Sequence, residues 1–152
     1  MTNMVTGPGD VLRSYLAAGD AQRFDEFPRV LHDAVVVHSP GGATCVGIAA
    51  QVDTWQAAHA GLSNLHHAVE QLLVSGDLVA AHVTVSGTHE GVFLGVEPTG
   101  NRLHVDQALF ARVCDGGIRE MWEVVDTGDG LRQLGVLAHQ PLGLTRDPAS
   151  DG

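Results

Sequence analysis

The sequence has few cysteines and few basic residues, and both shortages restrict the functions open to it. Only two of its 152 residues are cysteine, Cys45 and Cys114, and neither lies in a CxxC-type cluster. We therefore interpret both as reduced packing residues and expect no metal site built on them. Eight basic side chains stand against 18 acidic ones, a formal charge of −10. This sign disfavours nucleic acids and anionic membrane surfaces as partners and favours a neutral or weakly charged small molecule.

Long apolar stretches and common catalytic motifs are also missing. No run approaches the roughly 20 apolar residues that a membrane span needs. The first residues, MTNMVTGPGD, lack the basic region and the apolar block of a signal peptide. We therefore expect a cytoplasmic protein. A GxSxG motif is absent, and none of the nine histidines has the HExxH spacing typical of a zinc site.

Length and composition predict one domain with a real core. Hydrophobic residues make up 44% of the 152 residues, so the chain can fold without disulfide bonds or structural metal ions. Gly7-Pro8-Gly9 interrupts regular structure near the start, and small polar residues with two prolines follow Gln140. We expect a disordered N-terminus over residues 1–8, a single domain over residues 9–139 and a flexible tail over residues 140–152.

The hydrophobic pattern changes from a helical period to a period of two along the chain. Helices are predicted from Asp10 to Asp20, over Ala21–Leu31, over Gly47–Leu62 and from Thr127 onward. Strands are predicted over residues 33–38, 66–74, 78–89, 103–113 and 118–126. This order is typical of an α+β fold. We expect a curved antiparallel sheet wrapped around about three helices, forming a cone with an apolar pocket.

The last two predicted strands form a hairpin around a turn at residues 114–117. A register that closes on this turn places Trp122 opposite Phe110 and Asp126 opposite Asp106. Because side chains alternate across a strand, one face of the hairpin then carries His104, Asp106, Ala108, Phe110, Trp122, Val124 and Asp126. We predict that this largely apolar face, with two carboxylates and an imidazole at one end, lines the pocket. A slip of one residue would exchange the two faces.

Several segments in combination resemble the SnoaL-like polyketide cyclases, within the nuclear transport factor two and ketosteroid isomerase superfamily. These segments are Gly76–Ala81, Gly87–Gly100, Asp115–Trp122 followed by Asp126, and Leu131–Gly135. The resemblance extends roughly from Val11 to Leu137. It implies an α+β cone, a homodimer or homotetramer, a hydrophobic pocket, and no metal or organic cofactor.

The resemblance also implies a reaction. Ring-closing members of this family run an intramolecular aldol condensation with an aspartate as acid and base, and Asp126 corresponds to that residue. The leading hypothesis is a cofactor-independent enzyme of secondary metabolism, such as antibiotic biosynthesis, that acts on a hydrophobic, oxygenated, polyketide-like substrate. His104 and Asp106 would polarise or protonate an oxygen. The predicted substrate-binding residues are His38, Trp55, Phe110 and Trp122.

Two other functions fit the same residues. An epoxide hydrolase or epoxide-opening cyclase would use Asp106 and Asp126 to hold a water or an internal hydroxyl, with His104 as the basic residue. Alternatively, the cone would be a non-catalytic module for ligand binding or dimerisation. In that case Asp126 would serve only as a charge at a helix N-terminus. Carboxylates enclosed in an apolar cavity would favour an enzyme, and exposed carboxylates would favour the binding module.

Overall fold

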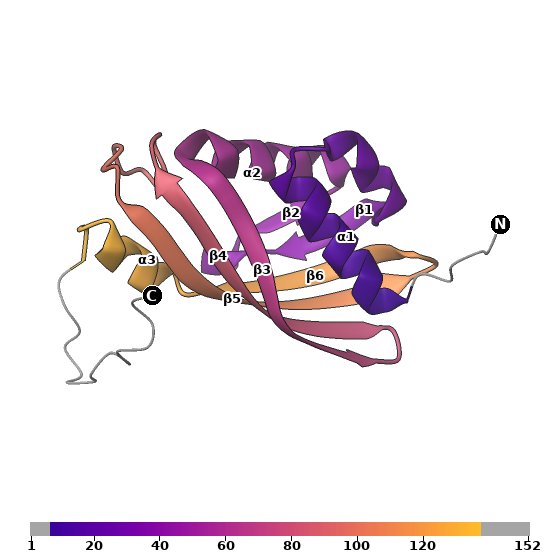
Figure 1. Ribbon diagram of the computed structural model, residues 1–152. Coiled ribbons are helices and arrows are strands. Elements are labelled where there is room, and N and C mark those ends of the chain that lie inside the picture. Colours follow the sequence, from indigo (N-terminus) through magenta and orange to yellow (C-terminus); the bar gives the residue numbers. More distant parts are fainter. Residues whose placement is uncertain (1–6, 138–152) are drawn as a thin grey trace.

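A six-stranded sheet curves around two longer helices and carries a short third helix at one end (Figure 1). The computed structural model describes residues 7–137. The helical elements are α1 (Pro8–Asp20), the 3₁₀ helices η1 (Phe24–Arg29) and η2 (Pro40–Gly42), α2 (Ile48–Gly61) and α3 (Thr127–Gln133). The strands are β1 (Leu31–His38), β2 (Thr44–Val46), β3 (Leu62–Ser75), β4 (Leu78–His89), β5 (Arg102–Cys114) and β6 (Gly117–Val125).

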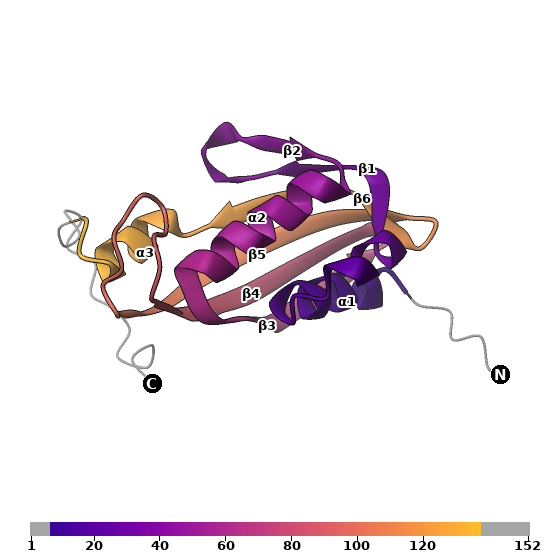
Figure 2. The same ribbon diagram turned by 90° about the horizontal axis from the view of Figure 1, so that it is seen from above.

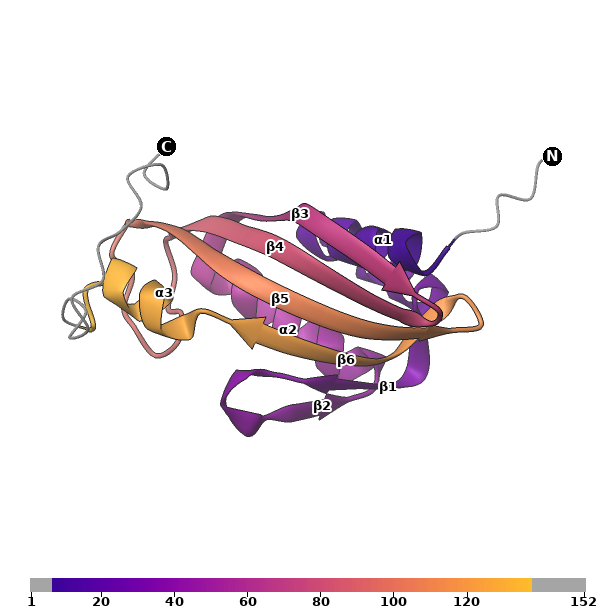
Figure 3. The ribbon, with the colours of Figure 1, turned by 90° about the horizontal axis from the view of Figure 1, so that it is seen from below.

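The sheet is antiparallel over most of its width. Its strand order is β2-β1-β6-β5-β4-β3, and only the β1–β6 pair is parallel. The register of β3 against β4 shifts between Ser63 and His66 and again between Val69 and Gln71. Such irregularities bend a strand and increase its twist. The long strands therefore curve, and Figure 3 shows them crossing beneath α1 and α2 as one twisted surface.

Helices α1 and α2 cover one face of this sheet, and the core lies between them and the strands (Figure 2). Helix α1 buries Val11, Leu12, Tyr15 and Leu16, which recur at helical spacing. On β5 the buried residues alternate with exposed or partly buried ones. The buried set is Leu103, Val105, Gln107, Leu109, Ala111 and Val113. This alternation gives the sheet an inner face toward the helices and an outer face away from them.

The predicted α+β cone is confirmed, and the differences are local. The helix expected over Ala21–Leu31 is the short η1, because Pro28 lacks an N–H and Leu31 already pairs with Ile118 of β6. The strand β2 was not predicted, and the sheet is mixed rather than wholly antiparallel. Pro8, placed by the sequence in the N-terminal segment, is the first residue of α1, and Gly7 is its N-cap. Residues 1–6 and the predicted tail from 140 onward lie outside the described residues.

We predict that Gly19→Ala destabilises the fold. A Cβ at Gly19 would lie 2.4 Å from Cζ2 of Trp55, within the aromatic core. Overpacking of this kind costs about 1–3 kcal/mol, whereas alanine gains only about 1 kcal/mol over glycine in a helix. The free energy of unfolding, measured by urea denaturation, should therefore fall by up to about 2 kcal/mol.

The matched control is Gly128→Ala in α3. The nearest atom to a Cβ there is a guanidinium nitrogen of Arg132 at 3.6 Å, an ordinary contact. Without a clash, this variant keeps only the helix gain of alanine over glycine, so its free energy of unfolding should equal or exceed that of the wild type by up to about 1 kcal/mol. Equal stability of the Gly19 variant and the wild type would show that α1 and α2 can separate without cost.

Candidate active site

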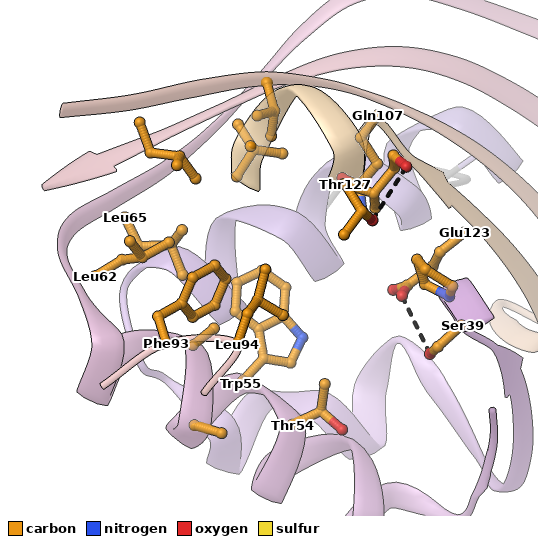
Figure 4. A pocket seen from close by; sticks show the side chains of 18 of the residues that line it. Ser39, Thr54, Trp55, Leu62, Leu65, Phe93, Leu94, Gln107, Glu123 and Thr127 are labelled. Carbon is orange, nitrogen blue, oxygen red and sulfur yellow. Dashed lines mark hydrogen bonds between the residues drawn. The ribbon is translucent and has the colours of Figure 1, made fainter. Parts of the chain in front are cut away.

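A cavity of about 870 Å³ lies between the inner face of the sheet, α2 and the loop that joins β4 to β5 (Figure 4). Most of its lining is aliphatic or aromatic. The apolar lining residues include Leu62, Leu65, Val85, Phe93, Leu94, Leu103, Val105 and Val125. The polar lining residues include Ser39, Gln51, Thr54, His67, Gln107, Glu123, Asp126 and Thr127. A neutral, mainly hydrophobic molecule suits such a wall, and the few polar groups would fix its orientation.

Glu123 is the acidic side chain that the sheet directs into this cavity. It lies on β6 opposite Leu109, and both belong to the inner face. Burial raises the pKa of the Glu123 carboxyl above its usual range, against the lowering effects of a hydrogen bond from Ser39 and of His67. The Ser39 hydroxyl donates to Glu123 Oε2 at 3.3 Å (Figure 4). A carboxylate whose pKa is raised in this way is a stronger base than a solvated one, which suits it to take up and return a proton.

Gln107 lies beside Glu123 on the neighbouring strand. It pairs with Val125, so it is a diagonal neighbour of Glu123 on the same face. Its side chain is buried, and its Oε1 has no hydrogen-bond partner among the described residues. Because a buried polar atom normally finds a partner, this amide oxygen is available to accept a hydrogen bond from a ligand hydroxyl in the cavity.

An aromatic cluster holds the opposite wall in place. The Tyr15 hydroxyl accepts hydrogen bonds from Trp55 Nε1 at 2.8 Å and from Gln51 Nε2 at 2.7 Å. Burial raises the pKa of Tyr15, so this hydroxyl stays protonated. The ring of Trp55 stands edge-on to that of Tyr15, with centroids 5.8 Å apart. These contacts fix Trp55 at the cavity wall, and its role in substrate binding stays a prediction.

A tight turn in the β4–β5 loop brings two further apolar side chains to the cavity. Phe93 and Val96 exchange backbone hydrogen bonds of 3.1 and 2.9 Å, and Leu94 between them has a φ of +52°. The buried His89 anchors the base of the loop through the Val96 carbonyl and the Thr99 hydroxyl. Figure 4 shows Phe93 and Leu94 at the same end of the cavity as Leu62.

The predicted hairpin register holds from Gln107 to Arg112 and shifts by one residue beside the turn, but the predicted pocket face is wrong. Phe110 pairs with Trp122, as expected. The face that carries them is nevertheless the outer one, because the helices cover the face of Val105 and Leu109. His104 and Asp106 are exposed there, and Asp106 accepts a hydrogen bond from His82 at 2.9 Å rather than facing a cavity.

The remaining predicted residues divide between the two faces. His38 and Trp122 are absent from the cavity wall; their rings stack on each other at 5.4 Å, and His38 pairs with Glu120 at 2.8 Å. Phe110 is 41% exposed and also lies outside the cavity. Asp126 borders the cavity at an exposed position just after β6, where its carboxylate accepts the Asp129 N–H and caps α3.

The expected pair of facing carboxylates is therefore not formed. The backbone does join the two residues, since the Asp126 N–H donates to the Asp106 carbonyl at 3.0 Å. Their side chains do not share a face. Asp106 lies within β5 and points from its outer face, whereas Asp126 lies beyond the end of β6 and borders the cavity. Sequence reasoning missed Glu123 and Gln107, although the alternation of large apolar residues at 103, 105 and 109 pointed to the face that they share.

The described residues show neither a metal site nor a membrane span. Between residues 7 and 137 no three histidine, cysteine, aspartate or glutamate side chains gather closely enough to hold a metal ion. No helix in this range is long and apolar enough to cross a bilayer.

Comparison with known proteins identifies relatives of this architecture. The family model described as SnoaL-like polyketide cyclase matches residues 9–134. IdmH from Streptomyces antibioticus, a candidate polyketide cyclase, is 28% identical, with a TM-score of 0.77 over 85% of this chain and 99% of its own. AclR from Streptomyces galilaeus, a candidate hydroxylase, is 25% identical, with a TM-score of 0.77 over 89% of this chain and 85% of its own.

A third structure supports the fold alone. It is a candidate SnoaL-like polyketide cyclase from Jannaschia sp. CCS1, 20% identical, with a TM-score of 0.79 over 91% of this chain and 98% of its own. No curated protein sequence matches the chain significantly. The family model covers most of the chain, including every strand of the cone and the residues of its cavity. The chain therefore belongs to the SnoaL-like polyketide cyclase family.

Proposed function

We propose that this protein is a cofactor-independent acid/base enzyme that closes a ring in a polyketide-like molecule by an intramolecular aldol reaction. One observation carries the proposal: the Glu123 carboxyl, with its pKa raised by burial, faces an apolar cavity of about 870 Å³. An ionisable group in such a place costs stability, and a cavity that merely binds a hydrophobic ligand has no use for it. Family membership and the likeness to IdmH favour the same reaction class.

In this proposal Glu123 removes a proton from a carbon next to a carbonyl group. The resulting enolate attacks a second carbonyl of the same molecule, and a carbon–carbon bond forms. The Gln107 amide lies diagonal to Glu123 and would donate a hydrogen bond to the enolate oxygen. Trp55 and the apolar loop residues Phe93 and Leu94 would hold the substrate chain folded in the cavity.

The outward position of Asp106 bears on the alternatives. An epoxide-opening reaction with Asp106 and Asp126 around one water would need both carboxylates in one cavity, and Asp106 is exposed on the outer face. We therefore favour proton transfer at carbon. Asp126 remains the alternative base, because it borders the cavity. The homodimer or homotetramer implied by the family, and a role in secondary metabolism, stay part of the proposal.

Glu123→Gln should abolish proton abstraction without unfolding the protein. Glutamine keeps the size of the side chain and can still accept from Ser39, but it cannot act as a base. The measurement is hydrogen–deuterium exchange at the benzylic α-carbon of 2-tetralone, a neutral bicyclic ketone, followed by NMR in D₂O. We expect the variant to exchange this position about 10²–10⁴-fold more slowly than the wild type does.

The matched variant is Asp126→Asn, which removes the carboxylate at the cavity rim and still offers an oxygen to the Asp129 N–H. It should retain most of the exchange activity. If it instead abolishes exchange while Glu123→Gln retains it, Asp126 is the base that the sequence predicted. A wild-type protein that exchanges 2-tetralone no faster than buffer alone would contradict the proposed reaction class.

The same Glu123→Gln variant should be more stable than the wild type at neutral pH. Burial raises the folded-state pKa of Glu123 above its ordinary value of 4.5. The folded protein thus favours the protonated carboxyl, and this contribution to stability is lost as the pH rises through the raised pKa. Glutamine is neutral throughout. The melting temperature of the variant should exceed that of the wild type at about pH 8, and the difference should shrink toward pH 4; a constant difference would mean that Glu123 is well solvated.

A further inference from the structure

Asp20, the last residue of α1, accepts hydrogen bonds from His67 of β3 through both of its carboxylate oxygens. Asp20 Oδ1 accepts from His67 Nδ1 at 2.6 Å, and Asp20 Oδ2 accepts the His67 backbone N–H at 2.7 Å. The two side chains are only 14% and 9% exposed. This double contact fixes both the position of the histidine backbone and the rotation of its ring.

The contact assigns separate tasks to the two ring nitrogens. Because Nδ1 donates to a carboxylate, Nε2 is the atom left to gain or lose a proton. Among the described residues His67 Nε2 has no hydrogen-bond partner, and the His67 side chain lines the cavity. Trp55 packs against the ring, with centroids 4.9 Å apart, so the imidazole cannot easily turn away.

The position of Asp20 works against a purely structural explanation. An acidic side chain at the C-terminal end of a helix meets the negative end of the helix dipole, which is unfavourable. An asparagine or serine could accept the same backbone N–H without that charge. The charge is useful if the imidazole opposite it passes through a protonated state, because a carboxylate at Nδ1 stabilises the imidazolium.

His67 and Glu123 face the same cavity from different strands. His67 pairs with Val85, and Val85 pairs with Val105, so His67 shares an inner-face row with these two valines. Glu123 lies on β6, three strands from β3, in the row of Leu109 and Ala81, which is four residues along the strands from the row of His67. On a flat sheet this offset would be roughly 20 Å. The curvature of the sheet shortens it, and His67 still lowers the pKa of Glu123. Both polar side chains therefore line one cavity, whose wall between their strands includes the apolar side chains of Val85 and Val105.

We propose that His67 is a second proton-transfer residue of this cavity and that Asp20 positions it. The inference rests on the proposed function and adds the proton donor that ring closure needs. Glu123 takes a proton from carbon, the enolate carbon bonds to the acceptor carbonyl carbon, and the carbonyl π electrons move to its oxygen. Protonated His67 then gives the Nε2 proton to that alkoxide. The substrate exchanges a C–H for an O–H bond, and a later transfer from Glu123 to His67 restores both groups.

The test separates the two proton transfers with two probes. Exchange of 2-tetralone needs a base at carbon, whereas cleavage of a β-hydroxyketone also needs a group that takes the proton from its hydroxyl. A suitable β-hydroxyketone is the aldol adduct of acetone and 6-methoxy-2-naphthaldehyde, because retro-aldol cleavage releases the fluorescent aldehyde. His67→Gln should slow this cleavage on the order of 10²-fold, and at least tenfold more than it slows exchange. Glutamine can still donate to Asp20, which preserves the link between α1 and β3.

Asp20→Asn tests the positioning role. It should lower kcat for the cleavage with little change in KM, and Asp20→Glu should restore part of the loss. In the double variant Asp20→Asn with His67→Gln, the loss should be no larger than that of His67→Gln alone, because both changes disable one unit. The control is His66→Gln: His66 lies 3.5 Å from Asp20 but is 66% exposed and outside the cavity, so its loss should change neither reaction.

The outcomes distinguish this proposal from the one on which it rests. Equal losses in exchange and cleavage for His67→Gln, or losses that follow a fall in melting temperature, would show that His67 only shapes the cavity. Wild-type exchange that depends on Glu123 without any cleavage of the β-hydroxyketone would also overturn the role of His67. Absence of Glu123-dependent exchange would instead refute the proposed function itself.

Discussion

The two-residue alternation of the β5–β6 hairpin is the constraint on which the rest of the structure depends. One set of side chains, which includes Val105, Leu109 and Met121, packs toward the helices and forms the floor of the core. The other set, which includes Phe110 and Val124, faces away. Each side chain of a strand points to one face of the sheet or to the other. The face that the helices cover therefore decides which polar residues reach the cavity and which reach solvent.

The inner face uses this alternation to place very few polar groups among many apolar ones. Glu123 and Gln107 occupy diagonal positions on adjacent strands, and His67 lines the same cavity from β3. Apolar neighbours remove water from these groups and raise the pKa of the carboxyl. The same burial that costs stability therefore supplies the proton affinity that acid/base chemistry at carbon requires.

The helices not only cover the inner face of the sheet but also position side chains at the cavity wall. The aromatic cluster around Tyr15 sets the orientation of Trp55, and Gly19 leaves the space that the indole ring needs. One residue further along, α1 ends at Asp20, whose carboxylate holds His67. The end of α1 thus contacts both the aromatic core and the cavity wall. A substitution that shifts this part of α1 should therefore also shift the side chains that line the cavity.

The sequence by itself determined the α+β class, the long antiparallel strands and the pairing of Phe110 with Trp122. These features depend on local periodicity, turn residues and motif resemblance, which can all be recognised from residues close together in the sequence. Only the tertiary structure decided which hairpin face is inside. Phe110 and Trp122 are large and apolar, so they mimic a core face, yet α1 and α2 cover the opposite side. Asp20 and His67 are 47 positions apart in the sequence, and only the fold brings them into contact. A local sequence pattern therefore cannot predict this hydrogen bond.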